Sequence, residues 1–240
     1  MVGLGTLINC GCILLGGIFG MLFGRFVKEN VQDALSKVCG LVAIFMALSG
    51  AMEEMLRVEN GKIVSSGTML ILGSLSIGTL LGELCGIEKA IERFGQWLKI
   101  KTGNAKDGNF VEAFVTASLT ICIGAMAIVG AIEEGVTGNY EILATKAVLD
   151  LVTIMVMTCA MGKGCIFSMI PVALLQGGVT ALAGLLKPIM TEQALSNLSM
   201  VGSVMIFCVG VNLIWGKKIR VANMLPAIVF ATAAAFLPIA

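Results

Sequence analysis

A lysine and an aspartate stand four residues apart inside a long apolar stretch of this 240-residue chain. In "KAVLDLVTIMVMT", Lys146 and Asp150 lie about one helical turn apart, so they can form an ion pair on one face of a helix. An ionisable side chain near the centre of a bilayer costs about 2.5–3.5 kcal/mol, so its presence needs a reason. Two interpretations stay open: Asp150 binds a proton or cation, or the pair only holds its helix to a neighbour.

Amides and glycines in other apolar stretches are the next candidates for a binding site. Asn9 and Gln176 carry amide groups that must find partners if they lie in lipid. Gln176 directly precedes Gly177–Gly178, and glycine weakens a helix. This stretch is therefore a candidate broken helix, and Gly16–Gly17 is its counterpart in the first apolar stretch. We expect these two segments to form a central site, with backbone groups as ligands and the ion pair nearby.

Several polar residues near the ends of apolar stretches are secondary candidates. Glu83 precedes a charged segment and can reach the lipid headgroups from there. Glu53–Glu54 and Glu133–Glu134 each close an apolar stretch, as solvated helix ends or as acidic pairs that attract cations to a vestibule. Asn212 adds a further amide.

The residue types exclude several chemistries. The chain has no histidine, so it cannot form a Ser–His–Asp triad, a zinc-protease helix or a histidine-bound haem. No G-x-x-x-x-G-K-[ST] phosphate loop occurs. Cys10 and Cys12 are too close together for the usual zinc spacings, and we expect the eight cysteines to pack as small apolar side chains. We therefore expect no enzyme activity, no metal and no cofactor.

The composition indicates which elements must position these residues. Hydrophobic side chains make up 58% of the chain and charged ones 13%, against about 25% charged in soluble domains. A membrane-spanning helix needs about 20 mostly apolar residues. Stretches of this kind cover residues 5–24, 36–55, 66–86, 112–132, 141–161, 165–185, 194–215 and 219–239. We predict an all-α integral membrane protein of about eight transmembrane helices, forming one polytopic domain over residues 1–240.

Charge along the loops predicts the orientation. Most of the 16 lysines and arginines follow the first, third, fifth and seventh stretches, and such loops stay cytoplasmic. We therefore expect both termini to be extracytoplasmic, because a seven-span chain would place the basic cluster 217–220 on the wrong side. Residues 87–100 repeat apolar side chains at helical spacing opposite charged ones. This pattern predicts a short amphipathic helix lying in the membrane interface, anchored by Trp97.

Similar segments recur along the chain. Five glycines of residues 5–24 match five of residues 67–86, in the pairs Gly5/Gly67, Gly11/Gly73, Gly16/Gly78, Gly20/Gly82 and Gly24/Gly86. "LSGAMEEM" resembles "IVGAIEEG", and residues 173–196 resemble residues 13–36. These matches predict helix-pair units at about 5–55, 66–132 and 165–215, with the third inverted relative to the first. Inverted repeats are typical of secondary transporters, whereas glycine spacing alone also serves close helix packing.

Four blocks of the sequence resemble a known family. They are "GTLINCGCILLGGIFGMLFGRF", "FVTASLTICIGAMAIVGAIEEGVTG", "KAVLD" and "GVNLIWGKKIRVANMLPA". They are similar to the YdfK/YqgA-type family of bacterial inner-membrane proteins, catalogued as domain of unknown function 554. The resemblance covers essentially the whole chain and implies a multi-pass protein of the bacterial plasma membrane. It brings no known substrate and no site residues.

Together, these features predict a secondary transporter of a small solute or ion, coupled to H⁺ or Na⁺. The excess of carboxylates over bases within and near the outer spans favours a cationic or zwitterionic cargo. Three alternatives remain: a substrate-binding subunit of a larger transporter, a channel, and an assembly protein that transports nothing. We expect the lipid bilayer and a small molecule or ion as partners and no nucleic acid, and the sequence leaves a homo-oligomer open.

Overall fold

The apolar stretches of the sequence fold into helices in the computed structural model, which describes residues 2–59 and 61–236. The helices are α1 (Leu4–Gly24), α2 (Glu29–Met55), α3 (Thr68–Cys85), α4 (Ile87–Lys101), α5 (Phe110–Cys122), α6 (Ala125–Thr137), α7 (Glu141–Met161), α8 (Met169–Ala181), α9 (Ala183–Leu186), α10 (Glu192–Trp215) and α11 (Pro226–Ala234). Two 3₁₀ turns, η1 (Lys163–Ser168) and η2 (Val221–Met224), lead into α8 and α11. The all-α prediction is confirmed except for one small hairpin.

Not every expected span is long enough to cross a membrane. Among the described residues, six helical segments are long and apolar enough: α1, α2, α3, α7, η1 with α8, and α10. Helices α5 and α6 make a seventh span if they are taken together, although they are bent by 62° at their junction. The stretch Val221–Ala234 is shorter, and residues 237–239 of the expected eighth span lie outside the described residues. The architecture is thus that of a membrane protein with six or seven candidate spans, and the eighth is not confirmed.

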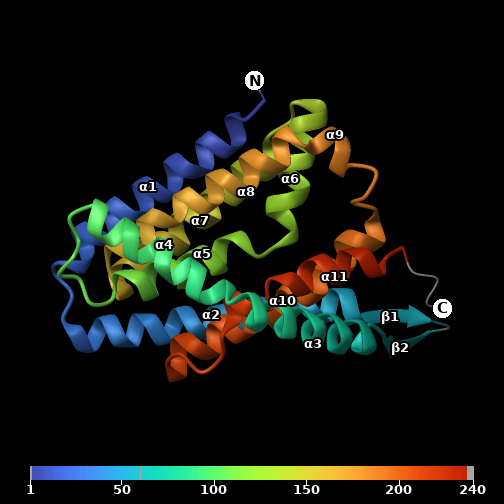
Figure 1. Ribbon diagram of the computed structural model, residues 1–240, viewed down its shortest axis with the longest axis horizontal. Helices are drawn as coiled ribbons and strands as arrows, with labels where there is room; N and C mark the ends of the chain where they lie inside the picture. The colour runs from blue at the N-terminus through green and yellow to red at the C-terminus, as the bar shows by residue number, and fades with distance from the viewer. Residues whose placement is uncertain (1, 60, 237–240) are drawn as a thin grey trace.

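Three long helix pairs form the frame of the molecule. Helix α1 packs mainly on α7, α2 on α10, and α3 on α11. Figure 1 shows α1, α6, α7 and α8 in one group and α2, α3, α10 and α11 in another, with α4 and α5 between them. Helices α1 and α7 run parallel, because Gly5 adjoins Leu143 while Gly24 adjoins Cys159. Helices α2 and α10 run antiparallel, because Gly40 adjoins Leu213 while Gly50 adjoins Ser203.

The matched glycines of α1 and α3 make the same kind of contact: each lets its helix approach the backbone of another segment. Gly16 and Gly20 lie against the backbone of α7, at Leu151 and Met155. Their counterparts Gly78 and Gly82 lie against Ala227 and Asn223, in α11 and η2. The glycine repeat therefore corresponds to two close helix contacts inside the chain, as expected when small residues let backbones approach.

The molecule has two ends, which we name by their contents. The basic end carries the loops after α1, α7 and α10, with Arg25, Lys163 and Lys217. On the side away from it, the N-terminus lies at the end of the α1 group, and an antiparallel pair of strands, β1 (Leu56–Glu59) and β2 (Lys62–Ser65), lies at the separate end of the α2 group; we call this whole side the hairpin end (Figure 1). The hairpin was not predicted from the sequence. Its turn contains Gly61 at φ 74°, a backbone conformation that glycine adopts most readily.

Helix α4 confirms the predicted amphipathic helix. Gly86, at φ 62°, ends α3 and begins α4, so the chain changes direction there. Leu98 and Gly95 face α5, where Phe114 and Val111 lie against Gly95. Trp97 is half exposed on the opposite side, as expected for an anchor at a membrane surface.

Candidate substrate- or ion-binding site

The Lys146–Asp150 pair lies in the interior of the molecule. Both residues are on α7, and the 2.5 Å distance between Nζ of Lys146 and Oδ2 of Asp150 marks a direct ion pair. Only 8% of each side chain is exposed. Helices α1, α2, α5 and α6 all pack against α7. The four-residue spacing read from the sequence thus gives a buried, hydrogen-bonded ion pair.

Two buried amides stand beside the ion pair. Asn9 on α1 donates a hydrogen bond from Nδ2 to Oε1 of Gln176 on α8, over 3.2 Å. Asn9 also neighbours Asp150, and both amide residues are almost fully buried. The structure therefore brings together the four polar residues predicted for the site, from α1, α7 and α8.

The predicted helix breaks are wrong. Helix α8 continues through Gly177 and Gly178, and a Cβ atom at either position would meet nothing within 4 Å among the described residues. Gly16 and Gly17 lie inside α1 and serve as contact points for Leu151 and Ile166. Paired glycines lower helix propensity, but packing and intact hydrogen bonds hold these two helices together. These glycines provide no free backbone ligands.

The broken span is α5–α6 instead. Helix α5 ends at Cys122, Ile123 and Gly124 are extended, and α6 begins at Ala125. Cys122 lies near both Lys146 and Asp150. A helix end leaves carbonyl groups without intrahelical partners, and a helix start leaves N–H groups. Both kinds of backbone group are thus available next to the ion pair.

A second buried polar cluster lies toward the hairpin end. Glu134, near the end of α6, is fully buried, and its Oε1 accepts a 2.6 Å hydrogen bond from the backbone N–H of Gly5. The hydroxyl residues Thr6 on α1 and Thr180 on α8 are also buried. Sequence reasoning ranked Glu134 as secondary and missed both threonines. Both threonines could have been predicted from helical spacing: Thr6 lies three residues before Asn9 and Thr180 four residues after Gln176, which puts each pair on one helix face.

The remaining secondary candidates lie elsewhere and have local partners. Glu83 pairs with Arg220 over 3.0 Å, and Glu54 accepts a hydrogen bond from Ser196. Glu133 accepts one from Asn139, and Glu53 is exposed. Asn212 binds backbone groups of Lys218 and Ile219 and so shapes the loop after α10. None of these residues is part of the Asp150 site.

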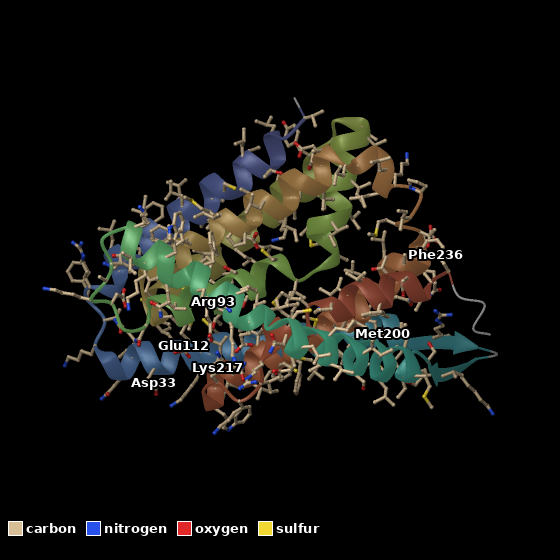
Figure 2. All side chains as sticks on the ribbon, in the orientation of Figure 1. Asp33, Arg93, Glu112, Met200, Lys217 and Phe236 are labelled. Atoms are coloured by element: carbon tan, nitrogen blue, oxygen red, sulfur yellow. The ribbon has the colours of Figure 1, made fainter. Side chains whose placement is uncertain are left out.

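A polar cavity of about 550 Å³ opens at the basic end. Its lining includes the carboxylates Asp33, Glu92 and Glu112, together with Lys217 and Thr116. Figure 2 shows Asp33, Glu112 and Lys217 gathered at this end, away from Met200 and Phe236. A cleft that holds more carboxylates than bases raises the local concentration of cations.

Lys217 connects this cavity to α4. Its ammonium group binds Glu88 over 2.6 Å and also binds Glu92. Burial acts to lower the pKa of Lys217, but hydrogen bonds and charge from Glu88 and Glu92 outweigh it and raise the pKa above its ordinary value. Lys217 therefore stays charged at neutral pH and offsets part of the acidity.

An apolar layer lies along α7 beyond Asp150: Ile154 and Met157 belong to it, and Met161, which lines the polar cavity, packs against it. Its members are Ile13, Ala113, Ala117, Ile121, Ile154, Met157, Cys165 and Val172. Its members are buried among apolar neighbours, so we expect a polar solute to pass from the cavity to Asp150 only if these helices move apart. A second cavity, of about 620 Å³, is mainly apolar. Its lining includes Cys122 and Gly124, at the break between α5 and α6, and Pro171 on α8.

Comparison with known proteins identifies the family but not an activity. The chain is 27% identical over 232 residues to "Uncharacterized protein YqgA" of Escherichia coli (strain K12), covering 95% of this chain and 94% of the relative. It is 26% identical over 228 residues to "Uncharacterized membrane protein YdfK" of Bacillus subtilis (strain 168), covering 93% and 92%. No solved structure matches. The model of the family described as "Protein of unknown function (DUF554)" matches residues 4–236, so the chain belongs to this family.

Proposed function

We propose that this protein is a secondary transporter of a small cationic or zwitterionic solute or ion in the bacterial plasma membrane, coupled to H⁺ or Na⁺. The observation that carries the proposal is the buried Lys146–Asp150 pair beside a broken span. Ionisable residues within membrane helices mark substrate or ion pathways by default, because their burial is costly. Asp150 is the proposed ligand or coupling carboxylate, and the proposal includes no enzymatic step.

The broken span supports this reading over a merely structural ion pair. Transporters commonly bind substrates and ions at discontinuous helices near the middle of the membrane, where freed carbonyl and N–H groups act as ligands. Helix α5 ends at Cys122, and Cys122 lies near Asp150, so the break between α5 and α6 is close to the proposed ligand. Non-helical backbone at membrane depth is tolerated only where protein or water satisfies it. Site and break thus occur together.

The cavity at the basic end supports a cationic or zwitterionic cargo. Glu112 and Thr116 lie one turn apart on α5 and both line this cavity, and the same helix ends at the break. We propose that cargo enters here and that the apolar layer opens to admit it to Asp150. Opening on one side and then on the other would give alternating access.

An assembly function through glycine faces has less support. Gly16, Gly20, Gly78 and Gly82 all lie against other helices of the same chain, so these faces are not available to a partner. A substrate-binding subunit remains the stronger alternative, since it needs the same site but no change of access.

The test is flux in liposomes that contain the purified full-length protein. A panel of amines, amino acids and monovalent cations is offered with and without H⁺ and Na⁺ gradients, and uptake and current are recorded. We expect gradient-dependent uptake of at least one cargo that is lost in Asp150→Asn and in the double variant Lys146→Met/Asp150→Leu. Glu141→Gln, which removes an exposed carboxylate from the same helix, serves as the control and keeps full uptake.

The double variant separates function from structure. Replacing both members of a buried pair by apolar residues preserves folding more often than removing one. If the double variant folds and still transports, Asp150 is structural and the proposed site is wrong. If the wild-type protein is stabilised by a panel member but moves none under any gradient, it is a binding subunit. Flux far above about 10³ per second would instead indicate a channel.

A further inference from the structure

The fully buried carboxylate of Glu134 is only half satisfied. Oε1 accepts the hydrogen bond from Gly5, but Oε2 has no hydrogen-bond partner in the described part of the chain. The hydroxyl oxygens of Thr6 and Thr180 are likewise buried without partners there. Leaving one such polar group unpaired costs about 1–3 kcal/mol, and a charged group costs more. Three unpaired oxygens in one region therefore require an explanation.

Packing brings these three oxygens to one level of the bundle. Thr6 follows Gly5, whose N–H binds Glu134. Thr180 adjoins Gly135, the residue after Glu134. On the antiparallel pair α1 and α8, Asn9 and Gln176 are bonded to each other, and Thr6 and Thr180 both lie about one turn farther toward the hairpin end. Thr6 and Thr180 thus lie on two different helices at the level of the Glu134 carboxylate.

The acidic and basic groups of this buried region do not balance. The buried polar region between α1, α6, α7 and α8 contains the carboxylates of Glu134 and Asp150 but only the ammonium group of Lys146. Lys146 is bound to Asp150, so the carboxyl group of Glu134 has no cationic partner among the described residues. Glu134 and Thr180 also lie in the last turns of α6 and α8, and the C-terminal end of a helix favours a positive charge.

We infer that Glu134, Thr6 and Thr180 form a binding site for one monovalent alkali cation, with sodium as the best fit. Hard cations prefer oxygen ligands, and membrane transporters complete sodium sites with carbonyls at helix ends. A divalent cation would need more charge, and the described residues contain no group of three or more acidic or sulfur ligands. As the site of the coupling ion, it rests on the proposed transport function; cation binding itself does not.

Thermal unfolding of the purified full-length protein in detergent tests the site without any transport. Melting temperatures are compared in sodium chloride and choline chloride at equal ionic strength. We expect the melting temperature to rise with sodium concentration, because a ligand that binds only the folded state stabilises it. Glu134→Gln should abolish this rise while keeping an oxygen to accept the Gly5 hydrogen bond. Glu133→Gln, the neighbouring carboxylate bound to Asn139, should leave it unchanged.

A second variant guards against misfolding of Glu134→Gln. Thr180→Val removes one oxygen at nearly constant volume. It should raise the sodium concentration needed for the same rise in melting temperature by about tenfold, equivalent to about 1.4 kcal/mol. The double variant Lys146→Met/Asp150→Leu should keep the response to sodium even if it transports nothing, which separates the failure of one proposal from that of the other. Equal melting temperatures in sodium and choline, or an unchanged response in Glu134→Gln or Thr180→Val, would overturn the inference.

Discussion

At the residue scale, the ion pair between Lys146 and Asp150 combines a high cost with a local solution. Each charge loses most of its hydration on burial, and the partner one turn away returns part of that energy. The neighbouring amides Asn9 and Gln176 are only partly satisfied, since Oδ1 of Asn9 and Nε2 of Gln176 have no partner within the described residues. A site with spare donors and acceptors beside a charge is suited to a polar ligand.

The first prediction concerns stability and uses the asymmetry of buried pairs. Asp150→Asn leaves the ammonium of Lys146 buried without a counter-charge, so we expect it to lower the free energy of unfolding by about 3–5 kcal/mol. Lys146→Met/Asp150→Leu should recover most of this loss, because no charge then remains to be buried. Chemical or thermal unfolding in detergent measures both. A double variant less stable than Asp150→Asn would show that the pair is the better solution for this site.

At the element scale, glycines divide into those that touch another helix and those that do not. Gly16 and Gly20 let α1 approach the backbone of α7, whereas nothing described lies within 4 Å of a Cβ placed at Gly11 of the same helix. The difference predicts opposite effects of one and the same substitution at different turns of α1.

Gly16→Ala should destabilise the protein by about 1–3 kcal/mol, because the added methyl group forces α1 away from the carbonyl of Leu151. Gly11→Ala, the matched control, should be neutral or stabilising by up to about 1 kcal/mol, since alanine forms helices better than glycine. Melting curves of both variants in one detergent give the comparison. Equal effects at the two positions would contradict the close packing of α1 on α7.

The sequence predicted most helices but not the place where one breaks. Apolar stretches of about 20 residues identify spans, because lipid forces the backbone to satisfy itself within each helix. Breaks depend on tertiary contacts, which is why Gly177–Gly178 stays helical and Ile123–Gly124 does not. The hairpin could have been found from Asn60–Gly61 between two short β-prone runs. Of the site, single residues were predicted, but the grouping of Thr6 with Glu134 needed the packing of α1 on its neighbours.

At the scale of the whole molecule, the two ends differ in chemistry. The basic end combines lysines and arginines in its loops with a cavity lined by carboxylates, whereas the hairpin end presents the N-terminus and the exposed strands β1 and β2. Between them, the buried polar residues extend from Glu134 to Asp150, and the apolar layer lies beyond Asp150. This order would let a coupling ion arrive from the hairpin end and a solute from the basic end, with Asn9 and Gln176 between the two carboxylates.

The last prediction fixes which end faces the cytoplasm. Lysine- and arginine-rich loops stay inside, so the basic end should be cytoplasmic and both termini extracytoplasmic. Helix α11 runs antiparallel to α3, because Gly78 adjoins Ala227 while Gly82 adjoins Asn223, so it returns the chain toward the hairpin end. A phosphatase that is active only outside the cytoplasm should therefore be active when fused after residue 240, and inactive when fused in the loop between α4 and α5. If the fusions after residue 240 and in the loop are both inactive, residues 219–239 do not cross the membrane and the chain has seven spans.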